Sequence, residues 1–284
     1  MKHFYLIANP TKQGAEGLAR QIGDYLRAKG ATCQGSPQQR EPGGRGHGYT
    51  DPSDIPDSTQ CVITLGGDGT LIQAARDLVE RRIPMIGINM GTMGYLTQIA
   101  RGEDILSMLD AMLEDRFRLE RRMMVEGTVR GADGEKKGIA LNEIVLTRRD
   151  VLHPLRFDLY VNGIFLNQYA ADGMILATPT GSTAYNLSAG GPIVTPAARL
   201  MALTPICSHS LYARSIILSN QDVVTIKPSQ AGGEGQMAVF DGDLALNLGT
   251  GESLEIRESQ SCTTLIQLRD VSFLENLRSK MNPI

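Results

Sequence analysis

The chain lacks the features of several large classes of protein. Its 28 Lys and Arg residues are outnumbered by 31 Asp and Glu residues, so no nucleic-acid partner is expected. Its apolar runs are of strand length, well short of the roughly 20 residues that cross a bilayer, which excludes membrane insertion. The apolar run of segment 1–10 ends at Asn9-Pro10, too early for a signal peptide, and predicts a first strand in a cytoplasmic protein.

Several motifs of nucleotide-binding and hydrolytic enzymes are also absent. There is no Gly-x-x-x-x-Gly-Lys-Ser/Thr, no Gly-x-Gly-x-x-Gly after the first strand and no Gly-x-Ser-x-Gly. These absences exclude P-loop enzymes, standard dinucleotide dehydrogenases and hydrolases with a nucleophile elbow. Neither the four cysteines nor the four histidines have metal-ligand spacing, so we expect reduced thiols and no protein-held metal.

What is present predicts two domains in the 284 residues, the first of them of the α/β class. Strand and helix patterns alternate over residues 1–120, which predicts a parallel sheet with ligands at the carboxyl ends of its strands. Apolar residues at helical spacing predict a helix over 14–29, ended by Gly30, and a later helix that begins near Thr70. The Gly- and Pro-rich stretch 41–57 is interpreted as a linker in preference to a lid.

The rest of the chain is β-rich, which predicts a β-sandwich-like domain over 121–270, followed by a short helical tail at 271–284. Asn162-Gly163, between two strand patterns, predicts a type I′ hairpin. The expected strands are Met123–Val129, Ile139–Thr147, Leu155–Val161, Ile164–Tyr169, Ser215–Leu218, Val223–Lys227, Met237–Phe240, Leu254–Arg257 and Thr263–Leu268.

A glycine turn, Gly66-Gly67-Asp68-Gly69-Thr70, follows the buried strand pattern 61–65. Glycines at such a turn let main-chain N–H groups and a helix start face an anion, which suits a phosphate chain. A carboxylate beside phosphates is unfavourable unless it holds a metal or accepts a proton from an attacking hydroxyl group. Asp68 therefore has either a chemical role or the simpler role of a helix cap, and the turn alone favours neither.

A second candidate segment, 171–192, is dense in glycine and in hydroxylated residues and follows a buried strand. Backbone and hydroxyl groups in such a loop allow a nucleotide to approach closely. An ordinary Gly/Ser/Thr loop has the same composition, so composition leaves both interpretations open.

Taken together, these segments resemble the NAD kinase family, which transfers the γ-phosphoryl group of ATP to the 2′-hydroxyl on the adenosine ribose of NAD, making NADP. The resemblance covers nearly the whole chain, to about Arg269, and its most discriminating part is Thr178–Pro192. The glycine turn by itself is also similar to turns of lipid kinases and phosphofructokinases. The motifs that carry the resemblance are Leu65–Thr70, Gly87–Thr97, Leu141-Asn142-Glu143, and Asp172 with Thr178–Pro192.

The resemblance implies a role for each matching residue. Asp68 is expected to be the general base, with Gly67 and Gly69 close to the phosphates, and Asn142 and Glu143 on the ribose hydroxyls of NAD. The remaining expected NAD contacts are His153, Asp172, Thr183, Ala184, Tyr185, Asn186, Leu187, Ser188 and Asp243. Core packing is the alternative for Tyr185, a structural role for His153, and a polar pair at a strand edge for Asn142 and Glu143.

Two positions depart from the family pattern. Asp243 stands where some relatives have an amide, and Ala170 stands where some bacterial members carry a basic residue. The resemblance further implies Mg²⁺, held mainly through ATP, and a homodimer or homotetramer with small-molecule nucleotides as its other partners. A lipid kinase with the same glycine turn and a non-enzymatic NAD or NADP sensor are the competing functions.

Overall fold

The computed structural model describes residues 1–35, 50–91, 94–100, 104–132, 134–148, 154–210, 213–229, 235–249, 251–269 and 272–281. The chain forms two compact units, one of Met1–Arg122 with Ser261–Ile284 and one of Met123–Gln260. This division differs from the expected 1–120, 121–270 and 271–284, because the chain returns to the first unit within a strand, β17 (Ser253–Gln267). A strand that continues from one unit into another has no composition shift to mark the boundary.

The first unit is built on a parallel sheet. Its strand order is β2 (Thr32–Gly35), β1 (His3–Ala8), β3 (Cys61–Gly66) and β4 (Met85–Asn89), each parallel to its neighbour. Two further segments pair with β4 in the same direction, β5 (Ile99–Ala100) and the end of β17. The predicted α/β domain with a parallel sheet is confirmed.

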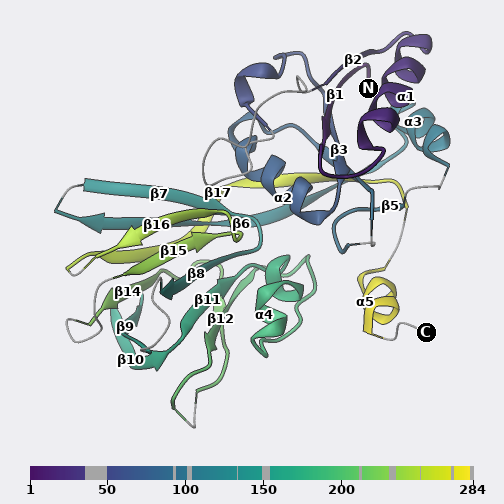
Figure 1. Ribbon diagram of the computed structural model, residues 1–284. Coiled ribbons are helices and arrows are strands. Elements are labelled where there is room, and N and C mark those ends of the chain that lie inside the picture. Colours follow the sequence, from purple (N-terminus) through teal and green to yellow (C-terminus); the bar gives the residue numbers. More distant parts are fainter. Residues whose placement is uncertain are drawn as a thin grey trace. The chain divides into compact units, whose positions relative to one another are not determined.

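Two helices of this unit, α1 and α3, pack apolar faces against the sheet. Figure 1 shows α1 and α3 side by side, and their buried residues share one core with Phe4, Leu6 and Ile63 of the strands. Successive residues of a strand point to opposite faces of the sheet, so the strand residues between these point to the face away from α1 and α3. The helices are α1 (Ala15–Ala28), α2 (Asp68–Asp77), α3 (Ile105–Leu113) and α5 (Phe273–Met281), with 3₁₀ turns η1 (Pro52–Asp54) and η2 (Val79–Arg81).

The second unit is a sandwich of two antiparallel sheets, as predicted. One sheet has the order β13-β12-β11-β8-β15-β16, and the other contains β10-β9-β14 with β17, β6 and β7. Side chains from both sheets form one buried core around Phe157 and Phe240. Apart from β17, the elements are β6 (Arg118–Gly131), β7 (Gly134–Ala140), β8 (Glu143–Arg148), β9 (Leu155–Val161), β10 (Ile164–Ala171), β11 (Gly173–Ala177), η3 (Gly181–Thr183), α4 (Tyr185–Ser188), β12 (Leu200–Ile206), β13 (Ile216–Ser219), β14 (Val224–Pro228), β15 (Gln236–Phe240) and β16 (Leu244–Leu248).

The predicted hairpin turn, which rests on two neighbouring residues, is confirmed. Asn162 and Gly163 have φ values of 52° and 78°, as a type I′ turn requires, and they join the antiparallel pair β9 and β10. The predicted bounds of three strands are wrong. The expected strand Ile139–Thr147 is divided between β7 and β8, and the two expected strands at 254–257 and 263–268 belong to the single strand β17.

The segment 41–57 lies inside the described residues only from position 50. There η1 is capped by Asp51, whose carboxylate accepts a hydrogen bond from the N–H of Ser53 at 2.9 Å. Arg81 holds the same segment, because its guanidinium donates to the carbonyl oxygens of Pro52 and Ile55. Among all the helices described, none is long and apolar enough to span a membrane.

Candidate active site

Asp68 lies at the point where the parallel sheet reverses its winding. Strand β1 has β2 on one side and β3 on the other, so the connections leaving β1 and β3 diverge at their carboxyl ends. In open α/β sheets this switch point is where ligands bind. Asn9, just after β1, links the ends of β1 and β3 to the start of α2: its N–H donates to the carbonyl of Leu65 at 2.9 Å and its Nδ2 donates to Thr70 Oγ1 at 3.0 Å.

Steric space explains one glycine of the turn, Gly66, and not the other two. A Cβ on Gly66 would collide with the side chain of Thr70, so the close approach of β3 and α2 requires glycine there. A Cβ on Gly67 or Gly69 would meet no protein atom within 4 Å, and neither residue has a positive φ. Nothing in the described protein therefore requires glycine at these two positions, which leaves open backbone at the start of α2.

The Asp68 carboxylate contacts the backbone of a neighbouring loop. It accepts the N–H of Tyr95 on Oδ2 at 2.6 Å and the N–H of Thr97 on Oδ1 at 3.0 Å. The N–H of Leu96 lies 3.2 Å from both oxygens, and the Thr97 hydroxyl donates to Oδ1 at 3.0 Å. The N-cap of α2 is Gly67, and no side chain in the described residues caps this helix, so the interpretation of Asp68 as a cap is wrong.

The loop that holds Asp68 is itself fitted to β4. A Cβ on Gly94 would collide with the Asp68 carboxylate, so only glycine lets the loop lie this close. Asn89, at the end of β4, donates from Nδ2 to Thr97 Oγ1 at 3.0 Å. The sequence did not indicate that this loop holds Asp68, because the role of a main-chain N–H leaves no side-chain signal.

A second group of predicted residues forms a corner at the break between β7 and β8. The Asp241 carboxylate accepts the N–H groups of Leu141, Asn142 and Glu143 at 2.8, 2.8 and 3.2 Å. Thr178, directly after β11, holds the same corner, since its N–H donates to the carbonyl of Asn142 at 2.8 Å and its Oγ1 to that of Leu141 at 2.6 Å. These bonds interrupt the strand and fix Asn142 and Glu143 in place.

Glu143 is a buried acid in this corner. Its side chain is 6% exposed, and its Oε2 has no hydrogen-bond partner among the described residues. Burial, with a further contribution from the negative charge of Asp241, raises the pKa of Glu143 to about 8. At neutral pH the carboxyl group is therefore mainly protonated and able to donate a hydrogen bond.

This burial predicts a pH-dependent stability. The folded-state pKa lies above the unfolded value, so the folded protein binds more protons between about pH 4.5 and 8, and unfolding free energy falls as pH rises through that window. Glu143→Gln removes the titration, and the variant should gain stability relative to wild type on going from pH 5.5 to 8. The slope is at most about 1.4 kcal/mol per pH unit for one proton. Urea unfolding at both pH values checks it, and an equal difference at both would contradict it.

Within the loop 178–192, some predicted contacts prove to be internal. Asn186 is fully buried: its Nδ2 donates to the carbonyls of Ser182 and Pro192, and its Oδ1 accepts the hydroxyl of Thr204 at 2.7 Å. Tyr185 is 45% exposed, so its core-packing alternative is wrong. Thr183 and Ala184 are half-buried, while Leu187 and Ser188 are exposed.

The other predicted residues are spread along the second unit. Asp172 precedes β11, whereas Glu143 pairs with Ala177 at the other end of that strand, about 16 Å away at ~3.3 Å per residue. The Asp172 carboxylate accepts a hydrogen bond from the guanidinium of Arg148 at 2.9 Å. Asp243 closes the turn after Asp241 through a bond from its N–H to the carbonyl of Phe240.

His153 lies outside the described residues. Among the residues that are described, no three acidic, histidine or cysteine side chains are grouped closely enough to hold a metal ion. Asp241 and Arg148 were not among the predicted contacts, although Asp241 belongs to the Asp-Gly-Asp turn at 241–243, which resembles a turn near the active site of the family.

An acidic residue at the switch point of a parallel sheet, with open glycines beside it, is an arrangement that can bind a phosphorylated ligand and take part in phosphoryl transfer. The family model described as the ATP-NAD kinase N-terminal domain matches residues 4–117, and the one described as the ATP-NAD kinase C-terminal domain matches residues 141–268. The chain belongs to the NAD kinase family.

Relatives and solved structures agree with this assignment. The chain is 42% identical to an NAD kinase of Lachnospira eligens, covering 99% of this chain and 100% of the relative. It is 40% identical to an NAD kinase of Agathobacter rectalis, covering 99% of each. The fold is similar to that of a yeast NADH kinase complexed with NADH (TM-score 0.83, 24% identity, 99% of this chain and 87% of that one). It is also similar to that of an Archaeoglobus fulgidus NAD kinase in complex with ATP (TM-score 0.79, 24% identity, all of both chains).

Proposed function

We propose that this chain transfers the γ-phosphoryl group of ATP to the 2′-hydroxyl on the adenosine ribose of NAD, with Asp68 as the general base. Membership of the NAD kinase family carries the overall reaction, from NAD to NADP. The position of Asp68, at the switch point and directly after β3, supports its role in the chemistry. The lipid kinase alternative shares with this chain only the glycine turn.

In the proposed reaction the 2′-oxygen of NAD attacks the γ-phosphorus, the bond to the β–γ bridging oxygen breaks, and ADP leaves. The proton of the hydroxyl passes to Asp68. Because the transition state of phosphoryl transfer is loose, the base acts mainly by positioning the nucleophile. The open backbone at Gly67 and Gly69 supports their proposed place beside the phosphates.

The contacts of Asp68 limit how it can receive the substrate. A carboxylate has about four lone-pair directions, and three N–H groups and one hydroxyl already occupy them. The substrate hydroxyl must therefore replace one donor. The hydroxyl of Thr97 is the donor that can rotate away without movement of the main chain, and we assign it that role.

The NAD contacts are proposed on the second unit. Asn142 and Glu143, fixed by Asp241 and Thr178, are assigned to ribose hydroxyls, and Asp243 lies in the same corner. A protonated Glu143 suits this task because it can donate as well as accept. The exposed Tyr185 and Leu187, with Thr183, Ala184 and Ser188, are assigned to the adenine and ribose, while Asn186 is assigned to support of the loop. Asp172 remains a proposed contact, as does His153.

Three further parts of the proposal concern the setting of the enzyme. Mg²⁺ would enter with ATP, held by phosphate oxygens as part of the substrate. A homodimer or homotetramer is supported by edge strand β10, which carries no charged residue and exposes Ile164, Phe165 and Leu166. Light scattering of the pure protein should give the mass of two or four chains.

A cytoplasmic location is supported by four unpaired cysteines.

An acceptor panel tests the proposed function. Pure protein is incubated with ATP, Mg²⁺ and either NAD, NAD lacking the 2′-hydroxyl, or diacylglycerol, and ADP release is measured. ADP should form with NAD alone. Release with diacylglycerol alone would support the lipid kinase, and none with any acceptor, despite measurable NAD binding, would support a non-enzymatic sensor. Repeating the NAD reaction with NADH and with polyphosphate in place of ATP defines the acceptor and donor range.

A further inference from the structure

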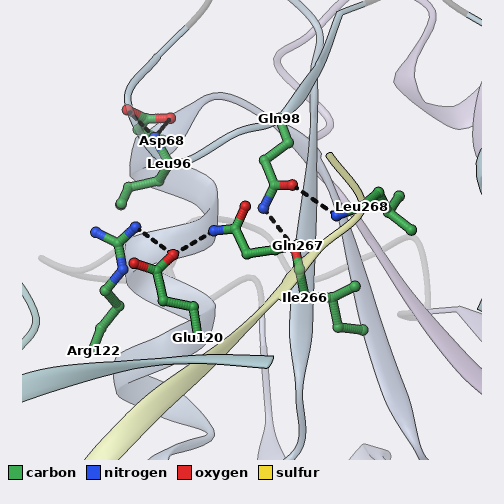
Figure 2. Close-up of polar contacts among 8 residues, drawn as sticks. All are labelled: Asp68, Leu96, Gln98, Glu120, Arg122, Ile266, Gln267 and Leu268. Atoms are coloured by element: carbon green, nitrogen blue, oxygen red, sulfur yellow. Dashed lines mark hydrogen bonds and ion pairs between the residues drawn. The ribbon is translucent and has the colours of Figure 1, made fainter. Parts of the chain in front are cut away.

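Gln98 makes an unusual pair of contacts directly after the residues that hold Asp68. Its Nε2 donates to the carbonyl oxygen of Ile266 at 2.6 Å, and its Oε1 accepts the N–H of Leu268 at 3.3 Å. Figure 2 shows this side chain reaching the end of β17, where its amide binds main-chain groups on both sides of Gln267. The side-chain amide thus takes the place of a pairing strand.

The main chain at Gln98 is fixed as well. Its N–H donates to the carbonyl of Gly87 on β4 at 3.3 Å. A Cβ on Gly87 would collide with the side chains of Thr97 and Leu71, so glycine at this position lets the loop sit against the strand. The loop 94–98 is therefore fastened at one end to two strands of the sheet, β4 and β17.

The other side of this loop is the surface that binds the Asp68 carboxylate. Three successive N–H groups, those of Tyr95, Leu96 and Thr97, converge on it, so their spacing sets where the two oxygens lie. A peptide segment that carries three donors to one carboxylate moves as a unit when its end is released. A displacement of about 1 Å at a reacting group can lower a rate ~100-fold.

We infer that Gln98 is a positioning residue for Asp68, acting through the loop 94–97 and the main chain of β17. This inference rests on the proposed role of Asp68 as the base. Gln98 itself touches neither the carboxylate nor, in this account, the substrate. Loss of its two hydrogen bonds should therefore lower kcat through misplacement of Asp68, while KM for NAD, which depends on contacts of the second unit, changes little.

The first test replaces Gln98 with leucine, a side chain of similar size that makes neither bond. Gln98→Leu should lower kcat about 10- to 100-fold and change KM for NAD by less than about threefold. Gln267→Leu is the matched control: it removes a neighbouring amide on the same strand, which donates to Glu120 and does not reach the loop (Figure 2). A kcat of Gln98→Leu within twofold of wild type, or an equal loss in Gln267→Leu, would overturn the inference.

A second variant, Gln98→Glu, separates the hydrogen bonds from mere packing and serves also if the leucine variant fails to fold. The introduced carboxyl, when protonated, can donate to the Ile266 carbonyl and accept from Leu268. When it is ionised it repels that carbonyl, and this repulsion raises its pKa from the ordinary value of about 4.3 toward the pH range of the assay. The kcat of the variant relative to wild type should thus rise as pH falls from 8 to 5.5.

Taking the ratio to wild type at each pH removes pH effects that are common to both proteins. The charged groups drawn near Gln98 in Figure 2, namely Asp68, Glu120 and Arg122, are the same in both. A ratio that does not change with pH would contradict the inference. The outcome is distinguishable from failure of the proposed base. If Asp68→Asn abolishes turnover while Gln98→Leu and Gln98→Glu match wild type, only the role of Gln98 fails; if Asp68→Asn turns over normally, the proposed base fails.

Discussion

Asp68→Asn should lower kcat for NADP formation by about 100- to 10,000-fold, the usual range for loss of a general base. Asparagine keeps the size of the side chain and one oxygen that can accept N–H groups from the loop 95–97, but it cannot take the proton of the attacking hydroxyl. Binding of NAD should change far less, because its proposed contacts on the second unit are untouched. Initial rates and calorimetric titration with NAD measure the two quantities.

The control for this variant is Asp24→Asn, which changes an exposed aspartate of α1 that forms an ion pair with Arg27 in the same helix. It should leave kcat and KM at wild-type values. Because Asp68 also holds the loop, the melting temperature of Asp68→Asn must be measured beside its rate. Turnover of a folded Asp68→Asn protein at the wild-type rate would remove Asp68 from the role of base.

Gly181→Ala should have the largest effect on the second unit. The added methyl group would meet the carbonyl oxygen, carbonyl carbon and Cα of Asn142, all main-chain atoms that cannot rotate away. Overpacking of this kind costs about 1–3 kcal/mol of unfolding free energy. It should also displace Asn142, and a loss of ~1.4 kcal/mol of NAD binding would raise KM about tenfold.

Gly17→Ala provides the matched control for this substitution. Gly17 lies in α1, has open space around a Cβ and has no positive φ, so alanine there should stabilise the protein by about 0.5–1 kcal/mol. Urea unfolding and NAD saturation curves are measured for both variants. Wild-type stability and KM in Gly181→Ala would show that the contact with Asn142 is relaxed without cost.

Elements whose signals are local could be predicted from the sequence. The helix α1 (Ala15–Ala28) follows from its apolar spacing and from Gly30, and the hairpin at Asn162-Gly163 from two residues that tolerate positive φ. The turn after β3 followed in the same way from its glycines. In each case the residues that determine the structure lie within a few positions of it.

The rest depends on partners far away in the chain. The break between β7 and β8 is held by Asp241, about a hundred positions later, and no local pattern at 139–147 indicates it. The continuity of β17 depends on pairing with β14 near one end and with β4 near the other. Long-range pairings of this kind are invisible to periodicity.

The candidate site was predictable in its residues more than in their contacts. The sequence singled out Asp68 but gave it the alternatives of base or helix cap, whereas its carboxylate binds the N–H groups of Tyr95, Leu96 and Thr97. Asn186 was expected at the ligand and has its amide satisfied inside the protein. Side-chain identity suggests a chemistry, and only the geometry says which partner occupies each atom.

The central claim, that the chain phosphorylates the 2′-hydroxyl of NAD, is tested most directly by the position of phosphate in the product. Pure protein is incubated with ATP, Mg²⁺ and NAD, and the product is examined by ³¹P NMR. We expect one new phosphomonoester signal, on the 2′-oxygen of the adenosine ribose, formed in equal amount to ADP. The claim would be contradicted if NAD stayed unphosphorylated at high enzyme concentration, or if the phosphate were found on another hydroxyl.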